Sequence, residues 1–313
     1  MRKSLMLTVA AASLLTAASS ACGAGTWVPA NVPLGGSNFT MFGINDKNVV
    51  TGDYTDSSGN IQGVIGPFDG SSYTSFTDGG TSTQPRGIGP TGIITGFDTG
   101  TLYPWERSTK GKLKNITLDG NPVTGVAQQV NKSGVFVGDH ANASGIGPAI
   151  GRKYRWTKVI KLKICNTGCA GRAIDDAGDT GGYYSDNSGI QHGFVNIVGQ
   201  KPIKVDYPNA HYTVVEGMNN KGTVSGQWED VSGVIHGFIY NINKKTYTSL
   251  DAPGASFTQV WGLNDAGVVA ASAAEPSGTE SFAYCMHSAG CPSAGAAVER
   301  QHRRPGKAVP QSN

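Results

Sequence analysis

Charged residues are scarce in this sequence, and it lacks the short motifs that mark common enzymes. Only 15% of its residues are charged and 45 of its 313 residues are glycine, a composition that excludes a helical bundle. No Gly-x-Ser-x-Gly elbow, phosphate-binding loop or dinucleotide fingerprint occurs. No loop carries the alternating ligands of an EF-hand, and the six histidines are scattered. We therefore expect no cofactor, no metal and no catalytic residue.

Long apolar segments are absent after the first 21 residues. The chain opens with Met-Arg-Lys, continues with an apolar run over residues 5–15, and then has small residues up to Ala21. This pattern predicts a secretory signal peptide over residues 1–21, whose apolar run is too short to span a bilayer. We therefore expect an exported protein without a transmembrane segment, located in the periplasm, at the cell surface or outside the cell.

The residue after the predicted cleavage site is a cysteine. Cys22 is placed where a lipoprotein carries its lipid, although Ser19 stands where such proteins have a bulky aliphatic residue. A lipid anchor at Cys22 is therefore an alternative to a soluble exported form.

Cysteines are otherwise few. Four remain, in two close pairs, Cys165 with Cys169 and Cys285 with Cys291. Their spacings fit a zinc site poorly, whereas each pair can close a small loop in an oxidising compartment. We favour two local disulfides, although the sequence alone does not fix the pairing.

Excess charge is also missing from the predicted folded part. The net charge is +3, but the signal peptide accounts for +2 and the tail from Glu299 onward for +3, which leaves about −2. The folded part thus has no basic nucleic-acid footprint, and we expect no nucleic-acid partner. Residues 292–313 lack apolar periodicity and are predicted to form a disordered basic tail.

A repeat runs through the rest of the chain. Six related stretches, such as GMNNKGTVSG at residues 217–226, share an aliphatic anchor that recurs every 42 to 45 residues. A glycine stands eight residues after each anchor, except that the last copy has Ala271. The anchors are Ile44, Ile88, Val130, Ile174, Met218 and Leu263.

Each copy predicts four short strands. The first ends at the anchor, a tight hairpin with a left-handed glycine follows, as at 219–222, and three further strands alternate with looser turns. Four strands in about 44 residues are typical of a propeller blade. We predict an all-β, six-bladed β-propeller over residues 26–291.

The two ends of the repeat region favour a closed ring. The sixth copy stops after its third strand, near Cys285, and a segment resembling the missing fourth strand lies at Trp27–Pro33. An N-terminal strand that completes the last blade removes the open edges of the ring. A solenoid would instead need capping repeats at both ends.

The repeated residues resemble a known family. The pattern G-[ILM]-N-[DN]-x-G-x-V-x-G, then Gly-x-x-His-small-Phe and Pro-Gly-Ala, is similar to the bacterial extracellular HAF repeats over about residues 30–285. The chain departs from the His-Ala-Phe core, with HGF at 192 and 236 and SFA at 281. The resemblance implies export and a propeller-like repeat, and it brings no established catalytic residues.

His192 and His236 recur at matching positions. One hypothesis makes them metal ligands or acid–base groups. We favour a structural role, a hydrogen bond to a neighbouring blade, because residues that recur with the repeat lie apart around the ring. Positions where the copies differ are the better candidates for function.

One variable register lies two residues before each anchor, on the strand nearest the central channel. There Arg86 and Arg172 are expected to converge on a carboxylate or sulfate. The alternative is an internal ion pair between Glu216 and an arginine in a water-filled channel. The full register is Phe42, Arg86, Gln128, Arg172, Glu216 and Trp261.

A second variable register lies ten residues after each anchor, at the end of the second strand. Aromatic residues there can stack on sugar rings, or they can cover the end of the blade core. The aromatic members are Tyr54, Tyr184 and Trp228, and the others are Asp98, His140 and Ala273.

Three function classes remain. The favoured one is a monomeric binding module that holds a glycan or a protein at one face of the ring, without catalysis. The second is a polysaccharide hydrolase or lyase with a site at the channel mouth. It is weakened because Glu216 is the only acid in the innermost register. The third is a purely structural envelope protein.

Overall fold

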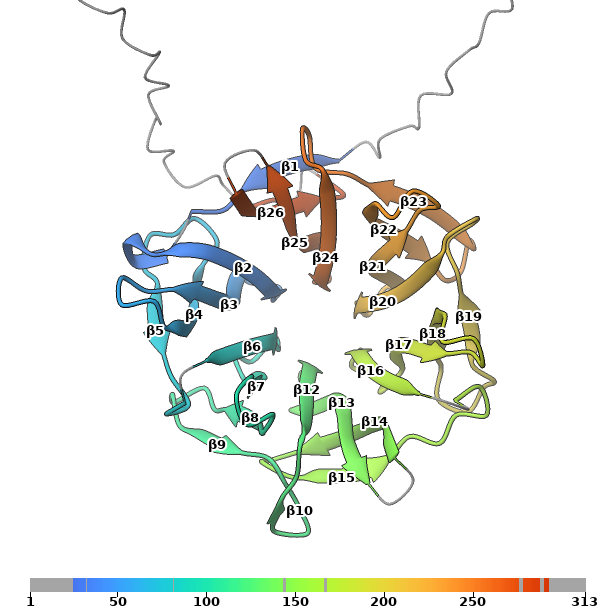
Figure 1. Cartoon of the computed structure of the whole chain (residues 1–313), viewed down its shortest axis with the longest axis horizontal. Helices are drawn as coiled ribbons and strands as arrows, with labels where there is room; N and C mark the ends of the chain where they lie inside the picture. The colour runs from blue at the N-terminus through green and yellow to red at the C-terminus, as the bar shows by residue number, and fades with distance from the viewer. Residues whose placement is uncertain are drawn as a thin grey trace, which may run out of the picture.

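The computed structural model describes residues 25–292 except 32, 81, 143–144, 166–167, 276–277 and 288–289. These residues form strands, short turns and one 3-10 turn, and no helix among them is long and apolar enough to cross a membrane. Six four-stranded antiparallel sheets surround a common centre (Figure 1). The predicted six-bladed β-propeller is confirmed. The predicted signal peptide, Cys22 and residues 293–313 of the predicted tail lie outside the described residues.

The first three blades follow the chain from the centre outward. Their strands are β2 (Ser37–Ile44), β3 (Val49–Thr55), β4 (Ile61–Pro67) and β5 (Thr74–Phe76) in blade 1; β6 (Thr83–Ile88), β7 (Ile94–Asp98), β8 (Pro104–Arg107) and β9 (Leu113–Asn115) in blade 2; β12 (Gly125–Val130), β13 (Val135–Asn142), β14 (Gly145–Arg152) and β15 (Trp156–Val159) in blade 3. A small hairpin of β10 (Thr117–Leu118) and β11 (Asn121–Pro122) joins blades 2 and 3.

The other three blades follow the same order, except that the outermost strand of blade 6 comes from the N-terminus. Their strands are β16 (Cys169–Ile174), β17 (Thr180–Ser185), β18 (Gln191–Asn196) and β19 (Ile203–Val205) in blade 4; β20 (Tyr212–Met218), β21 (Thr223–Glu229), β22 (Ile235–Asn241) and β23 (Thr246–Leu250) in blade 5; β24 (Phe257–Leu263), β25 (Val268–Glu275), β26 (Gly278–Cys285) and β1 (Thr26–Pro29) in blade 6.

Every innermost strand ends at its predicted anchor. In every blade but the second, where Gly89 follows the anchor, a side chain closes the turn that comes next. Asn219 Oδ1 accepts hydrogen bonds from the backbone N–H groups of Lys221 (3.0 Å) and Thr223 (3.1 Å). Gly222 has a φ of +70°, the left-handed conformation that favours glycine. In the first copy Asn48, with a φ of +55°, takes that place. The predicted hairpin is therefore confirmed.

The asparagine amide also links four of the blades to the next blade. Asn219 Nδ2 donates to the carbonyl oxygen of Asn264 (3.1 Å), and Asn264 Nδ2 donates to that of Asn45 (3.0 Å). The same link starts from Asn45 (3.3 Å to Gly89) and from Asn131 (3.0 Å to Asp175). Gly89 and Asp175 have no side-chain N–H, so blades 2 and 4 lack this outgoing bond. The end of the ring at which these turns lie is called the turn end below.

The glycine eight residues after the anchor is required by close packing inside blades 1 to 5, whereas blade 6 has Ala271. A Cβ atom at Gly226 would lie 2.1 Å from the carbonyl oxygen of Val214 on the innermost strand. The corresponding approach at Gly52 and Gly138 is 2.0 Å. These distances are far below van der Waals contact, so any larger residue forces the two strands apart.

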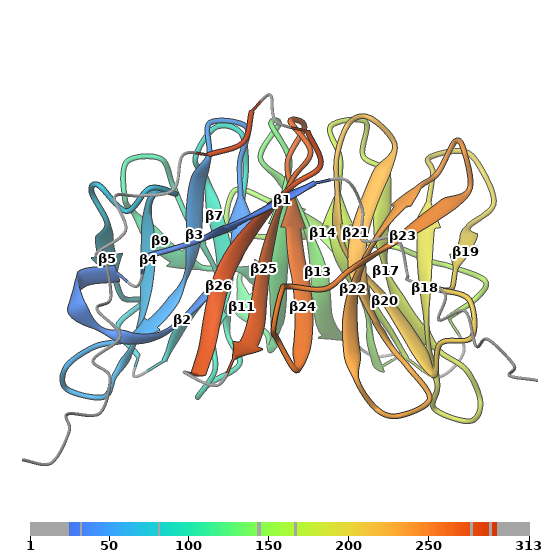
Figure 2. The same cartoon turned by 90° about the horizontal axis from the view of Figure 1, so that it is seen from above.

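The N-terminal strand closes the ring. β1 pairs antiparallel with β26, with Trp27 opposite Tyr284 and Pro29 opposite Phe282. Figure 2 shows β1 lying across the outer side of this blade. The backbone N–H of Gly25 also donates to the hydroxyl of Tyr284 (3.1 Å). The predicted completion of the last blade is confirmed.

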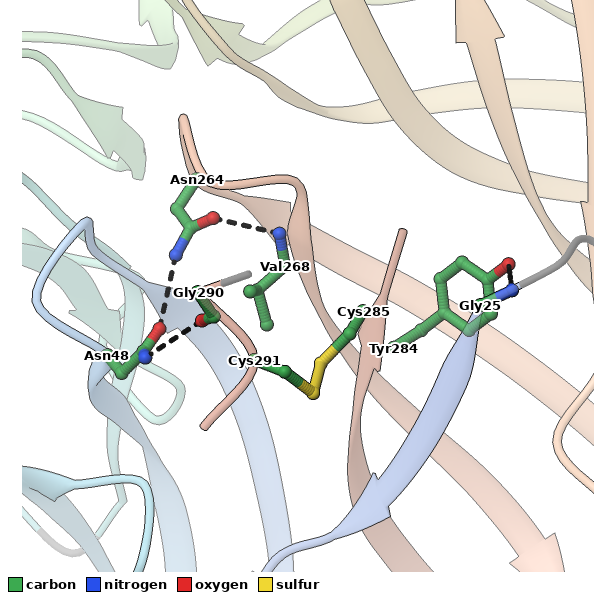
Figure 3. The surroundings of a disulfide bond; sticks show 8 residues. All are labelled: Gly25, Asn48, Asn264, Val268, Tyr284, Cys285, Gly290 and Cys291. Carbon is green, nitrogen blue, oxygen red and sulfur yellow. Dashed lines mark hydrogen bonds between the residues drawn. A yellow bond between two sulfur atoms is a disulfide. The ribbon is translucent and has the colours of Figure 1, made fainter. Parts of the chain in front are cut away.

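Both predicted disulfides are present, Cys165–Cys169 and Cys285–Cys291. The second holds the chain beyond β26 against blade 1, where Cys291 packs on the core and the carbonyl of Gly290 accepts a hydrogen bond from Asn48 Nδ2 (3.1 Å; Figure 3). Blades 6 and 1 are therefore joined at both ends of the chain. Two disulfides fit an exported protein, because such bonds persist in oxidising compartments.

Candidate functional site

Each innermost strand bulges just before its anchor. The pairing of β6 with β7 skips Arg86, that of β16 with β17 skips Arg172, and that of β20 with β21 skips Glu216. A bulge leaves one residue out of the ladder and redirects its side chain. The variable register before the anchors thus falls on the bulges, which turn its members away from the sheet.

These side chains meet on the axis of the ring. The guanidinium carbon of Arg86, on blade 2, lies 4.4 Å from the ring centroid of Phe42 and 4.9 Å from that of Trp261. Trp261 belongs to blade 6, two blades away, so the contact crosses the ring. Arg86 Nε also donates to Gln128 Oε1 (3.2 Å). The name axial cluster is used below for Phe42, Arg86, Gln128, Arg172, Glu216 and Trp261.

The charges of the axial cluster act on one another. Burial, followed by the positive charge of Arg172, lowers the pKa of Arg86 to about 10, while the charge of Glu216 opposes the shift. Burial also lowers the pKa of Arg172, but the charges of Glu216 and Asp139 outweigh it and leave that pKa above its usual value. The protein therefore stabilises the charge of Arg86 less than it stabilises the charge of Arg172.

Part of the hydrogen-bonding capacity of the cluster is unused. Among the residues that the structure describes, neither arginine forms an ion pair with a carboxylate, so the predicted pairing of Glu216 is not made. Arg172 Nε, Gln128 Nε2 and Trp261 Nε1 are buried without a hydrogen-bond partner. Buried polar atoms of this kind usually have a partner, so a bound molecule or water is expected beside them.

The turn end of the axis is narrow. All six anchors are buried there and line a cavity of about 50 Å³ together with turn residues. The turn residues bond to one another, since Asp265 N–H donates to Asp46 Oδ1 and Asn220 N–H donates to Asp265 Oδ1, both at 2.8 Å. A ligand for the axial cluster is therefore expected from the opposite end, called the loop end below.

A cavity of about 370 Å³ lies at the loop end, between blades 3 and 4. Asp139 and Tyr183 line it, and the guanidinium carbon of Arg172 lies 5.4 Å from the Tyr183 ring centroid. Asp139 Oδ1 is buried without a partner. Burial raises the pKa of Asp139, although the charges of Arg172 and Arg86 work against the shift. The other lining residues are Gly168, Cys169, Ala170, Ser185 and Gln191.

Sequence reasoning missed this cavity. Asp139 and Tyr183 both lie nine residues after their anchors, a register in which the copies also differ. Asp53 holds the same position in blade 1, where burial raises its pKa to about 6 and Gln84 Nε2 donates to it (2.9 Å). A comparison of the six copies at this register, next to the register ten residues after the anchor, identifies all three residues.

The predicted aromatic rim is mostly packed. Tyr54 is 5% exposed and belongs to the core of blade 1. Trp228 stacks on both Tyr207 (4.0 Å between centroids) and His236 (4.5 Å), so both of its faces are covered. Tyr184 contacts His192 (5.2 Å) and is half-buried. This arrangement favours the interpretation that Tyr54 and Trp228 cover the blade core.

The two repeated histidines bond within their own blades, not to a neighbouring blade as expected. His192 Nδ1 lies 2.8 Å from Asp206 and its Nε2 3.3 Å from Asp186. His236 repeats the arrangement with Asp251 (2.6 Å). Each histidine thus ties two loops of a single blade together, because the strand that carries it lies between them. No group of ligands suited to a metal ion occurs among the described side chains.

Comparison with known proteins gives structural similarity without sequence similarity. No protein-family model matches the chain, and no curated protein matches it. TolB from Acinetobacter baumannii has a TM-score of 0.50 at 10% identity, over 76% of this chain and 63% of that one, less than two thirds of its length. A gluconolactonase from Xanthomonas campestris also has a TM-score of 0.50 at 10% identity, over 83% and 97%. They share the propeller fold. At this identity the similarity extends to the fold alone.

Proposed function

We propose that the protein is an exported propeller module of the HAF-repeat kind that binds the acidic end of a glycan at the loop end of the ring. Catalysis is not part of this proposal. The disulfides support export, and the repeat pattern supports the relationship to the HAF repeats.

The axial arginines are the observation that carries the proposal. Arg86 and Arg172 lie close enough on the axis for their charges to interact, and they form no ion pair among the described residues. A carboxylate or sulfate between them would supply the missing charge and accept the unused hydrogen bond of Arg172 Nε. Guanidinium groups suit such planar or multi-oxygen anions.

The neighbouring cavity favours a sugar over a protein ligand. Its volume of about 370 Å³ is that of a small-molecule site, not of a surface for a folded partner. Asp139 and Gln191 offer hydrogen-bonding groups to hydroxyls, and Tyr183 offers an aromatic ring to a sugar face. A saccharide with one acidic group would fill the cavity and place its charge beside Arg172.

A binding assay with a matched pair of sugars tests the proposal. D-galacturonate is expected to bind, and D-galactose, which lacks the carboxylate, to bind at least ten-fold more weakly. Arg172→Gln is expected to remove that preference, whereas Lys201→Gln, an exposed charge on blade 4, is expected to leave it unchanged. Equal affinity for both sugars, or an unaltered preference in a folded Arg172→Gln protein, would overturn the proposal.

A polysaccharide hydrolase or lyase is the second candidate, because the loop end holds a second acid. Asp139 and Glu216 both act on Arg172, and burial raises the pKa of Asp139, as in a general acid. Glycoside hydrolases use two carboxyl groups of unlike pKa. If this candidate holds, polysaccharide cleavage is measurable in the native protein and lost in both Asp139→Asn and Glu216→Gln.

A further inference from the structure

The charge of the propeller is concentrated in one segment. Residues 101–163 contain eleven Lys and Arg residues against three Asp and Glu, whereas residues 26–100 and 164–291 together contain eight against eighteen. The segment therefore carries about +8 and the remainder about −10. The near-neutral net charge of the whole folded part conceals this division. The basic segment contains the two outer strands of blade 2, β8 and β9, and all of blade 3.

Nine of these basic side chains are exposed on the outside of the ring. None of them forms an ion pair within the part of the chain that the structure describes. They lie in the turn before β9, on β9, and on and around β15, the outermost strands of their blades. This surface, called the basic rim below, consists of Lys110, Lys112, Lys114, Arg152, Lys153, Arg155, Lys158, Lys161 and Lys163.

The basic rim is continuous between the two blades. Thr117, just beyond β9, donates its backbone N–H to the carbonyl of Tyr154 (3.1 Å). Lys114 Nζ lies 5.5 Å from the Tyr154 ring centroid. Glu106 is buried and accepts a hydrogen bond from Tyr154 N–H (3.2 Å), so this nearby acid is turned inward. Figure 1 places β9, β10 and β15 together on the outer side of the ring.

Protection of an open sheet edge is a simpler reason for lysines on outer strands. The other four outermost strands have fewer cations: β1 and β5 contain no basic residue, and β23 has only Lys244 and Lys245 in the turn before it. Lys204 on β19 is paired with Asp206 (2.8 Å). Edge protection therefore does not account for nine unpaired cations on two adjacent blades.

A groove of about 550 Å³ adjoins the basic rim between blades 3 and 4. Lys158 and Lys161 line one side of it, and Asn196 lies on the other. Val159 and Val198 form its apolar part, and Val198 is 64% exposed. A groove with charged, amide and aliphatic groups fits a polymer chain of sugar rings better than a flat lipid surface.

We infer that the basic rim binds an acidic polysaccharide, whose carboxylates or sulfates pair with the lysines and arginines while its sugar rings occupy the groove. The inference rests on charge complementarity and on the groove, and it does not depend on the axial cluster. Clusters of unpaired cations raise the local concentration of a polyanion and speed its association.

Polygalacturonate, a carboxylated polysaccharide, is the probe, and neutral dextran of similar length is its control. The purified protein is expected to bind polygalacturonate at low salt and to lose affinity as salt rises, and not to bind dextran. The triple variant Lys158→Gln, Lys161→Gln, Lys163→Gln is expected to lower affinity about ten-fold or more. Its control, Lys221→Gln, Lys244→Gln, Lys245→Gln, removes the same charge from exposed positions on blade 5 and is expected to change affinity little.

The inference is overturned by no binding at low salt, by an equal loss in both triple variants, or by tighter binding to phosphatidylglycerol vesicles than to polygalacturonate. Arg172→Gln separates this surface from the proposed axial site. If Arg172→Gln still binds polygalacturonate and the triple variant at Lys158, Lys161 and Lys163 (the rim variant) binds it more weakly, the basic rim is supported. That result does not depend on whether the proposed axial site binds a sugar. Binding lost in Arg172→Gln and kept in the rim variant overturns the inference.

Discussion

In four of the six turns one asparagine amide makes two kinds of bond, which explains why the repeat favours asparagine after the anchor. The oxygen of Asn219 closes its own turn, and the nitrogen reaches the carbonyl of Asn264 on the next blade. Asp175 occupies the same position in blade 4 and does only the first, with bonds from Ala177 and Asp179 N–H at 2.9 Å. The two residues therefore form a natural comparison.

Exchanging these two residues is expected to change stability in opposite directions. Asn219→Asp keeps the turn but removes the interblade bond to the carbonyl of Asn264, which retains only the bond from Gly267 N–H (3.1 Å), so a loss of about 0.5–1.5 kcal/mol is expected. Asp175→Asn adds a donor toward blade 5 and is expected to gain about 0.5–1.5 kcal/mol. Urea unfolding of both variants measures the change. Equal effects of the same sign would show that the interblade bond contributes nothing.

Asp53 is expected to weaken the protein near neutral pH. Burial holds its folded pKa at about 6 against an ordinary 3.8, so the folded state binds more protons between those values. Stability is therefore lost as pH rises from about 4 to about 6. Asp53→Asn removes that loss and is expected to raise the free energy of unfolding at pH 7 by about 1–3 kcal/mol.

The gain from Asp53→Asn should shrink toward pH 4, where the native carboxyl is also neutral. Unfolding curves across this pH range measure it. Asp56 provides the control, because hydrogen bonds from the backbone of Asn60 and Ser58 lower its pKa, so Asp56→Asn should bring no gain at pH 7. A gain from Asp53→Asn that stays constant with pH would exclude titration as its cause.

The site residues were partly accessible from the sequence. Comparing copies located the register that holds Arg86, Arg172 and Glu216, because function on a repeated frame requires the copies to differ. The histidine partners could not be derived in this way. Their distances depend on how the loops at either end of one blade fold back, which the spacing of residues along a strand does not encode.

At the scale of the strand, the bulge on the innermost strand lies beside the recurring glycine of the second strand. In blade 5 the bulge leaves Glu216 out of the strand pairing, and at Gly226 the second strand approaches the innermost strand closely. The sequence showed the recurring glycine but not the bulge, because a bulge is a property of pairing between strands. Strand order and strand ends were predicted well, since each anchor is followed by a turn that only certain residues can form.

Gly226→Ala tests this close approach. The new Cβ would lie 2.1 Å from the carbonyl oxygen of Val214, so a loss of about 2 kcal/mol or more is expected. Blade 6 already has Ala271 in this register, and Ala271→Gly is expected to change stability by only about 1 kcal/mol. Thermal unfolding measures both. If Gly226→Ala leaves the unfolding temperature unchanged, the two strands can move apart at no cost in stability, which would contradict the prediction.

At the scale of the molecule, the closure of the ring was predictable and the surface was not. The sixth copy has three strands, and the segment Trp27–Pro33 resembles the fourth strand that it lacks. The two fit together only if the ring closes on itself. The cavity beside Asp139 and the groove beside Lys158 lie between blades, where neighbouring copies contribute unlike residues. Their shape depends on packing across the junction, which no single copy specifies.

The disulfide Cys285–Cys291 is expected to stabilise the junction where the ring closes. Its removal as Cys285→Ala, Cys291→Ala should lower the free energy of unfolding by about 2 kcal/mol, because the segment held against Asn48 is released. Hydrogen exchange should rise mainly in β1, β2 and β26. The control pair Cys165→Ala, Cys169→Ala should instead affect β16, and identical exchange patterns would contradict a local role for either bond.

The links at the turn end do not join every pair of neighbouring blades. Besides the asparagine bonds, backbone N–H groups donate to the next blade from Lys132, Asp176, Asn220 and Asp265. Pro90 has no N–H to donate, and Gly89 has no side chain. Blades 2 and 3 are therefore the only neighbours without either link among the described residues. These two blades are joined instead on the outer side, where Tyr154 N–H donates to Glu106 (3.2 Å) and Thr117 N–H donates to the carbonyl of Tyr154 (3.1 Å). A polymer bound along the basic rim would therefore lie over the bonds that hold blades 2 and 3 together.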